Sequence, residues 1–246
     1  MKSRSIYAII PARGGSKGVP GKNIKLLKGF PLIAYSIAVA KLSNKINRVI
    51  VSTDSLEIAE IAKKFGAEVP FLRPAEFAQD KSPDIDFFKH AINWFSENEK
   101  DQPEFLVHLR PTTPLRDPSL IDQAIDSIIE NKNATALRSV HENAQPPQKM
   151  FGIENQFLTG LFPHDPRSEY YNLPRQAFPK AYNPNGYVDI VKTEYIKQHN
   201  MLHGPRMIGF VTPFTVEIDN ESDYNYLNYL IDTQSHRLYD YLTQNY

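Results

Sequence analysis

The sequence predicts an α/β fold built on a mostly parallel sheet with helices on both faces. Short apolar runs alternate with amphipathic stretches through the first 140 residues, which is the pattern of repeated strand–helix–strand units. The chain has 246 residues, of which 41% are hydrophobic and 23% charged. That length and composition suit one globular domain, residues 1–246, with a sizeable core.

Each element follows from a local signal. Short apolar runs predict strands at residues 6–10, 48–52, 68–72, 105–109, 134–140 and 214–218. Apolar residues at helical spacing predict helices at 31–40, 57–65, 84–95, 118–129, 221–233 and 238–246. Pro31 stands at the first position of the first helix, and Asp54 with Glu57 resembles a capping box for the second, which Gly66 ends.

Residues 142–186 interrupt this alternation. They are rich in proline and aromatic residues, so they are too apolar for a disordered linker and too broken for a long helix. We expect an inserted arm, with a hairpin and exposed aromatic side chains. Exposed apolar surface often marks a subunit contact. The alternative is an arm folded onto its own domain.

The loop after the first strand carries the strongest functional signal. Residues 9–23 read Ile-Ile-Pro-Ala-Arg-Gly-Gly-Ser-Lys-Gly-Val-Pro-Gly-Lys-Asn, with four glycines and the cations Arg13, Lys17 and Lys22. Glycines let backbone N–H groups approach an anion closely, so this loop predicts a polyphosphate site. Its spacing fits neither a Walker loop nor a dinucleotide fingerprint. The alternative is a surface turn with solvated charges.

Composition excludes several classes. Lys plus Arg and Asp plus Glu both number 28, which argues against a nucleic-acid binder. The chain has no cysteine, so disulfides, thiolate catalysis and cysteine–zinc sites are excluded. No apolar run has the length of a membrane span or the form of a signal peptide, so we expect a cytoplasmic protein without a membrane partner. His90, His108 and His141 lack metal-ligand spacing, and packing is their default role.

These motifs resemble those of the acylneuraminate cytidylyltransferases, the CMP-sialic acid synthetases and their relatives. The opening stretch 11–23 matches their first motif, and six later blocks match in order at residues 51–54, 73–80, 110–116, 174–176, 184–186 and 217–219. The resemblance covers nearly the whole chain. It implies a Rossmann-like nucleotidyltransferase fold and a homodimer, in which the arm is a dimerisation lobe that reaches over the partner's active site.

The implied reaction joins CTP to the anomeric hydroxyl of a nine-carbon α-keto acid sugar and releases pyrophosphate. The resemblance implies nucleotide contacts from Ala12, Arg13, Gly14, Ser16, Lys17, Lys22, Asn23, Arg73 and Asp84. Arg13, Lys22 and Asp219 are the predicted catalytic residues, because charge moves onto the leaving pyrophosphate. Arg73 is expected to donate to cytosine, and the alternative is a surface ion pair with Glu76.

A triphosphate calls for Mg²⁺, which takes oxygen ligands. Glu217 and Asp219 are two residues apart at the end of a strand-like run, so both carboxylates are expected to face one metal ion. The alternative is that Asp219 or Asn220 caps the helix that follows.

The acceptor sugar carries a carboxylate, which suits Arg175 with Gln176 beside it. The remaining predicted acceptor contacts are Arg110, Thr112, Thr113, Asn185 and Asp189. A purely structural turn competes for Asn185 and Gly186.

The chain departs from the family pattern at four positions. Sialic acid enzymes commonly have glutamine at Arg110, arginine at Asn183 and tyrosine at Asp189, and bacterial ones can have serine at Asp84. The added charge at Arg110 indicates a related nonulosonic acid, such as legionaminic or pseudaminic acid. The alternatives are a cytidylyltransferase for the shorter acid KDO and a non-catalytic nucleotide or sugar binder.

Overall fold

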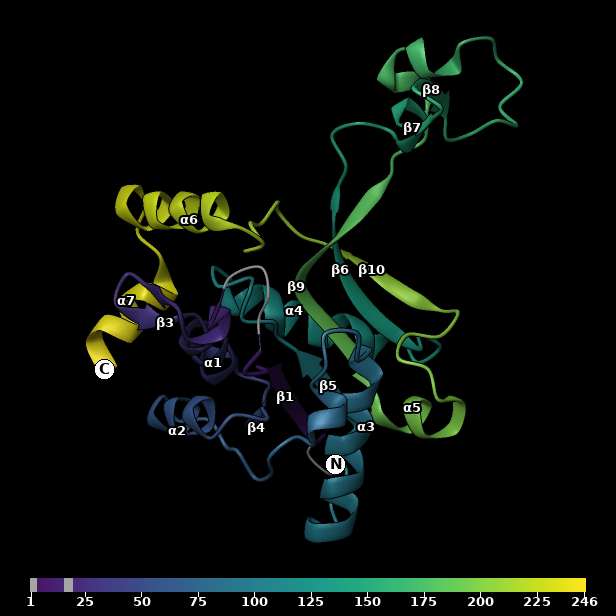
Figure 1. Cartoon of the computed structure of the whole chain (residues 1–246). Coiled ribbons are helices and arrows are strands. Elements are labelled where there is room, and N and C mark those ends of the chain that lie inside the picture. The colour runs from purple at the N-terminus through teal and green to yellow at the C-terminus, as the bar shows by residue number, and fades with distance from the viewer. Residues whose placement is uncertain (1–3, 16–19) are drawn as a thin grey trace.

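A six-stranded sheet forms the centre of the computed structural model, which describes residues 4–15 and 20–246 (Figure 1). The strands lie in the order β10-β6-β9-β5-β1-β4. Their bounds are β1 Ile6–Pro11, β4 Arg48–Ser52, β5 Phe105–His108, β6 Ala136–Glu142, β9 Tyr182–Lys192 and β10 Met207–Val211. Strand β9 is antiparallel to β5 and β6, and the other neighbouring pairs are parallel. The predicted mostly parallel sheet is therefore confirmed.

Helices cover both faces of this sheet, as predicted. They are α1 Leu32–Leu42, α2 Leu56–Lys64, α3 Asp84–Trp94, α4 Pro118–Glu130, α5 Thr193–His199, α6 Glu221–Thr233 and α7 Arg237–Asn245. Alternation along β1 separates two cores: Ala8 and Ile10 face α1, α2, α4 and α7, whereas Tyr7 and Ile9 face α3 and α5. In the described parts of the chain, no helix combines the length and hydropathy that a membrane span needs.

Two predicted strands are wrong. Residues 68–72 make only two isolated bridges, Ile50 with Glu68 and Thr53 with Leu72. Residues 214–218 are extended but lie outside the sheet, because β10 already occupies the edge beside β6. The extended segment instead reaches the loop after β5, where the Ile218 N–H donates to the Thr112 carbonyl at 2.8 Å.

The cap of α2 also differs from the prediction. Its N-cap is Ser55, whose hydroxyl accepts from the Ile58 N–H. Asp54 does not cap this helix. Its carboxylate instead accepts from the Gly14 N–H at 2.8 Å. Pro31 is the N-cap of α1 rather than its first helical residue. Gly66 follows the end of α2 with a φ of 84°, as its predicted role as a stop requires.

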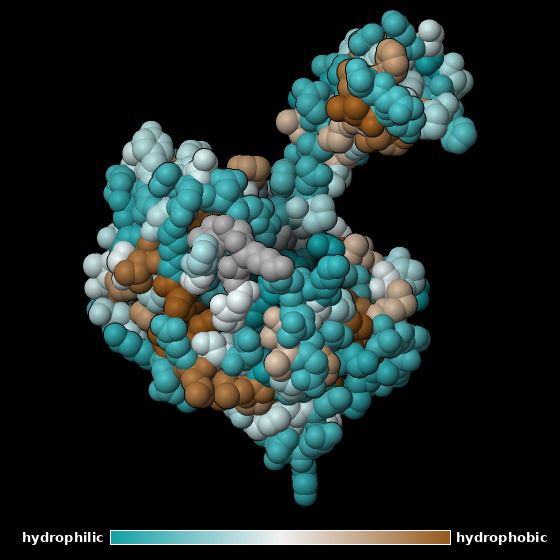
Figure 2. All heavy atoms as spheres, viewed as in Figure 1, coloured by the Kyte–Doolittle hydropathy of each residue, from teal (hydrophilic) through white to brown (hydrophobic). Residues whose placement is uncertain are grey.

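The arm extends away from the sheet beyond the ends of β6 and β9 (Figure 1). It contains a hairpin of β7 Phe151–Glu154 and β8 Phe157–Gly160. Hydrophobic side chains gather on it (Figure 2) and are exposed, notably Ile153, Phe157 and Leu158. The hairpin and the exposed aromatic residues are confirmed, and the alternative of an arm folded onto its own domain is wrong. Dimerisation through the arm stays a prediction.

Candidate active site

A cavity of about 510 Å³ lies at the carboxyl ends of β1 and β5. This edge of a parallel sheet is where ligands usually bind in α/β folds. The cavity brings together residues from four separate stretches of sequence that we predicted to be functional. Its lining includes Arg13, Lys22, Asn23, Arg73, Asp84, Arg110 and Thr112.

The first part of the lining is the loop after β1. Ala12 is buried, and its N–H donates to the Ser52 carbonyl at 2.9 Å. The Arg13 guanidinium donates to the Asp80 carboxylate at 2.6 Å, and both side chains are about one third exposed, at 30% and 36%. The carboxylate of Asp80 therefore holds a cation that a phosphate could bind. Ser16 and Lys17, two of the predicted contacts, lie outside the described residues.

The 3₁₀ turn Lys22–Ile24 positions the next two residues. Gly21 precedes it with a φ of 62°, which a residue with a side chain rarely adopts. The turn directs Lys22 into the cavity, where its Nζ donates to the Ile218 carbonyl at 2.7 Å and lies 3.7 Å from Asp219. The Asn23 amide donates to the Arg13 carbonyl at 2.9 Å. This side of the cavity is thus tied to the segment before α6.

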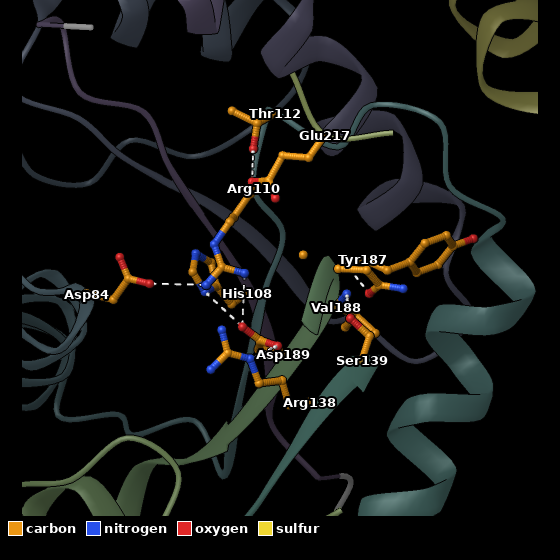
Figure 3. A network of polar contacts seen from close by, with 12 residues as sticks. Asp84, His108, Arg110, Thr112, Arg138, Ser139, Tyr187, Val188, Asp189 and Glu217 are labelled. Atoms are coloured by element: carbon orange, nitrogen blue, oxygen red, sulfur yellow. Dashed lines mark hydrogen bonds and ion pairs between the residues drawn. The ribbon is translucent and has the colours of Figure 1, made fainter. Parts of the chain in front are cut away.

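That segment holds the two predicted metal ligands, which have different partners. The Thr112 hydroxyl donates to Glu217 at 3.0 Å (Figure 3), whereas the Asp219 side chain is 77% exposed beside Lys22. Asn220, not Asp219, caps α6, in a capping box with Asp223. Asp219 is thereby left available as an oxygen ligand, which suits a hard divalent cation. The described residues hold no group of three or more His, Asp or Glu side chains with metal-binding geometry.

Arg73 lies on the wall of the cavity and is only 6% exposed, so the alternative of a surface ion pair with Glu76 is wrong. Its Nε donates to the Ser52 hydroxyl at 3.0 Å, and its Nη2 to the Ser52 carbonyl at 2.5 Å. The guanidinium stacks on the Phe87 ring at 5.0 Å. Burial lowers the pKa of Arg73 to about 10, so the side chain still carries its charge at neutral pH.

On the other side of the cavity, Arg110 is held by two carboxylates (Figure 3). Its Nη1 donates to Asp189 at 3.0 Å and its Nη2 to Asp84 at 3.2 Å. Burial alone would lower the pKa of Arg110, but these two carboxylates raise it above its ordinary value. Asp189 is only 1% exposed and lies on β9 directly opposite His108 of β5.

His108 also lines the cavity, a role that our default of packing did not predict. It is 2% exposed and lies edge-on to the Phe87 and Phe88 rings. Among the described residues, its Nε2 has no hydrogen-bond partner. Burial and then the neighbouring cations lower the pKa of His108 well below its usual range, so the imidazole is neutral at neutral pH. The sequence signal that could have placed His108 in the cavity was its position at the end of a strand, two residues before Arg110.

Arg116 is a further residue whose role the sequence did not show. It is 1% exposed and donates to the carbonyls of Arg110, Gly186 and Tyr187 and to the Ser36 hydroxyl. Burial lowers the pKa of Arg116 to about 9. Through these bonds it fixes the backbone from which Arg110 and Thr112 extend into the cavity.

Five predicted acceptor contacts do not line this cavity: Asp189, described above, and Thr113, Asn185, Arg175 and Gln176. Thr113 is fully buried. Asn185 is buried as well, since its amide donates to Thr212 at 2.7 Å and its oxygen accepts from the Tyr187 N–H at 3.2 Å. With Gly186 at a φ of 63°, these contacts favour the structural turn, and a ligand role for Asn185 stays a prediction.

Arg175 and Gln176 belong to the arm, as Figure 1 places their segment. They line a separate cavity of about 300 Å³ there, and Arg175 donates to the Ala144 carbonyl at 3.3 Å. Within one chain they therefore do not meet the residues of the main cavity.

Comparisons with known proteins identify the family of the chain. A family model described as cytidylyltransferase matches residues 7–236. The flagellin modification protein B of Campylobacter coli is 31% identical over 96% of this chain and 99% of its own. The CMP-N,N'-diacetyllegionaminic acid synthase of Campylobacter jejuni is 33% identical over 94% of this chain and 96% of its own. A CMP:2-keto-3-deoxy-manno-octonic acid synthetase structure superposes with a TM-score of 0.69 at 15% identity, over 93% of this chain and 99% of that one, and shows a shared fold. The chain belongs to the cytidylyltransferase family.

Proposed function

We propose that this enzyme transfers CMP from CTP to the anomeric hydroxyl of a nonulosonic acid and releases pyrophosphate. The observation that carries the proposal is one cavity whose wall holds Arg13, Lys22 and Arg73 together with Arg110. The first three suit a nucleoside triphosphate, and the last lies beside polar groups that suit a sugar acid. The 33% identical relative named for a legionaminic acid product supports this class of acceptor.

In the proposed reaction, the acceptor hydroxyl loses its proton as its oxygen bonds to the α-phosphorus, and the bond from that phosphorus to the pyrophosphate oxygen breaks. The protein positions the reactants and neutralises the charge that moves onto pyrophosphate. Lys22 suits the second task, because the Ile218 carbonyl and Asp219 direct its ammonium group. Arg13 suits the triphosphate, which would replace Asp80 as its partner.

Cytidylyltransferases generally use a divalent metal ion. We propose Mg²⁺ here, with Asp219 as one ligand and Glu217 nearby as a second. When bound, the ion would neutralise phosphate charge and orient the triphosphate. A cytoplasmic location stays a prediction from the sequence.

A pyrophosphate-release assay tests the proposal. CTP should support turnover with sialic, legionaminic or pseudaminic acid, and omission of magnesium should abolish it. Activity with KDO alone would reject the acceptor class. Binding of CTP without turnover of any acid would instead indicate a non-catalytic binder.

We also propose a homodimer in which the arm supplies Arg175 and Gln176 to the partner's cavity. The exposed apolar residues of the arm and its distance from its own cavity support this arrangement. Mixing Lys22→Ala with Arg175→Ala protein tests it. Subunit exchange would leave one intact site in each mixed dimer, so about one quarter of wild-type activity should return in an equal mixture. Two inactive proteins that stay inactive after subunit exchange would contradict the shared site.

A further inference from the structure

A group of charged side chains gathers behind the acceptor side of the cavity (Figure 3). Asp189, Arg138 and His108 come from the adjacent strands β9, β6 and β5. Asp84 begins α3, and Arg110 follows β5. Because β9 pairs with both neighbours, Asp189 lies opposite both His108 and Arg138, so the sheet register itself places these side chains together.

The buried carboxylate of Asp189 is the centre of this group. One oxygen accepts from Arg110 at 3.0 Å and lies 3.9 Å from the Nδ1 of His108. The other oxygen has no hydrogen-bond partner among the described residues, and the Nε of Arg138 lies 3.7 Å from it. An isolated buried charge is costly, whereas one that faces two cations is tolerated.

The formal charges of the group balance. Arg110 and Arg138 contribute two positive charges, Asp84 and Asp189 two negative charges, and His108 is neutral because burial lowers its pKa. The extra charge that the sequence shows at Arg110 is therefore not a free charge in the cavity. Three of the four departures from the family pattern form one unit, because Arg110 donates to both Asp189 and Asp84.

The contacts also fix the direction of Arg110. Asp189 and Asp84 hold one terminal nitrogen each, so the planar guanidinium cannot rotate without losing its hydrogen bond to the buried Asp189. A guanidinium has five N–H donors, and these two bonds use two of them. Arg110 remains 21% exposed and lines the cavity, so its other donors are available to a ligand.

We infer that Asp189 is a positioning residue, which with Arg138 fixes Arg110 on the acceptor side, and that this charge-balanced group selects acids whose substituent there is polar but uncharged. An acylamino or hydroxyl group would accept hydrogen bonds from Arg110. An ammonium group at the same place would lie against the guanidinium of Arg110, and this like-charge contact disfavours it even with the half-exposed Asp84 carboxylate nearby. The inference rests on the proposed function, because it concerns the acceptor of that reaction.

The experiment compares the wild type with Asp189→Asn, Arg110→Gln and the double variant, using CTP and two matched nonulosonic acids. One acid carries an acetamido group, and the other carries a free amine at the same carbon. Asp189→Asn should raise the KM for the acetamido acid about tenfold and leave the KM for CTP within about twofold. Preference is the ratio of kcat/KM for the acetamido acid to kcat/KM for the amine. In the double variant this ratio should fall at least about fivefold.

Arg48→Gln is the matched control. Arg48 also pairs with two carboxylates, Glu68 and Glu99, and is 22% exposed, but it lies at the start of β4, at the sheet edge away from the cavity. Its variant should leave both KM values and the acceptor preference unchanged.

The outcomes separate the two proposals. A wild-type enzyme that turns over no nonulosonic acid would contradict the proposed function. An active wild type whose Asp189→Asn variant keeps the acceptor KM, or raises both KM values equally, would overturn the inference alone. Should Asp189→Asn fail to fold, the double variant decides, because it removes both charges of this ion pair together and leaves neither without its partner. An unchanged acceptor preference in the double variant would overturn the inference.

Discussion

The two sides of the cavity hold their cations differently. Arg13 pairs with the partly exposed Asp80, and the ammonium group of Lys22 donates to a carbonyl and lies near the exposed Asp219. Arg110, by contrast, is bound to the buried Asp189 and rests on a backbone that the buried Arg116 fixes. Exposed partners exchange readily for phosphate oxygens, whereas buried ones do not. The proposed nucleotide side thus has partners that can exchange, whereas the proposed acceptor side has a fixed shape.

The largest expected effect is a loss of stability when the buried Arg116 is replaced. Arg116→Met should lower the free energy of unfolding by about 3 kcal/mol, because the carbonyls of Arg110, Gly186 and Tyr187 each lose a donor inside the protein. Urea denaturation measures this loss. Arg48→Met breaks ion pairs with partly exposed partners and keeps an apolar side chain beside the Tyr7 and Phe95 rings, so it should cost less than about 1 kcal/mol. Similar losses for the two variants would show that the acceptor side is not specially rigid.

Lys22→Ala tests the exchangeable side. It should lower kcat at least about tenfold, because the leaving pyrophosphate loses a cation, and should leave the unfolding transition unchanged. Steady-state pyrophosphate release gives kcat, and circular dichroism checks the fold. Lys28→Ala is a suitable control, since that lysine pairs with Asp232 outside the cavity lining. Normal turnover by Lys22→Ala would remove this residue from the mechanism.

His108 should make the stability of the folded protein depend on pH. Its pKa is lowered well below the ordinary value of 6.5, so below that pH the unfolded chain binds a proton that the folded chain does not. Stability should therefore be flat above about pH 6.5 and fall below it, by at most about 1.4 kcal/mol per pH unit from this residue. In urea denaturation between pH 7.5 and 5.5, His108→Gln should reduce this fall. Burial also lowers the pKa values of His90, His203 and His236, which contribute a remaining slope. An equal slope in the variant would exclude His108 as a source.

The smallest expected effect is a change in the KM for CTP when Asp80 is replaced. Asp80→Ala removes the carboxylate that pairs with Arg13, so phosphate no longer has to replace it. Because exposed ion pairs are worth at most about 1 kcal/mol, the KM for CTP should fall by no more than about fivefold. A large rise in this KM would mean that Asp80 itself helps to form the nucleotide site.

Local signals predicted much of this fold. The position of β1, the apolar spacing of α4 and the start of α6 each depend on neighbouring residues, and the structure confirms these elements. The strand expected at 214–218 was wrong because membership of a sheet depends on which partner edge is free. An apolar run alone cannot show that the edge beside β6 is already paired with β10.

The candidate site was predictable only in part, for a related reason. Motif positions indicated Arg13, Lys22, Arg73 and Arg110, and these share one cavity in the structure. The pairing of Arg110 with Asp189 joins residues 79 apart, so it depends on β9 lying between β5 and β6. His108 looked like a packing residue because its unpaired nitrogen and its place in the wall of the cavity are properties of the assembled sheet.

Strand β9, Tyr182–Lys192, runs from the arm into the middle of the sheet, but its register against β6 shifts between the Val140–Pro184 and Arg138–Asp189 pairs, where Gly186 has a φ of 63°. Beyond this irregularity, Asp189–Lys192 pairs residue by residue with β5. An inserted residue could be absorbed at the irregularity, whereas one inserted within the regular stretch would turn the Asp189 carboxylate to the opposite face of the sheet. The arm can therefore change in length without moving this carboxylate, provided that the stretch paired with β5 keeps its own length.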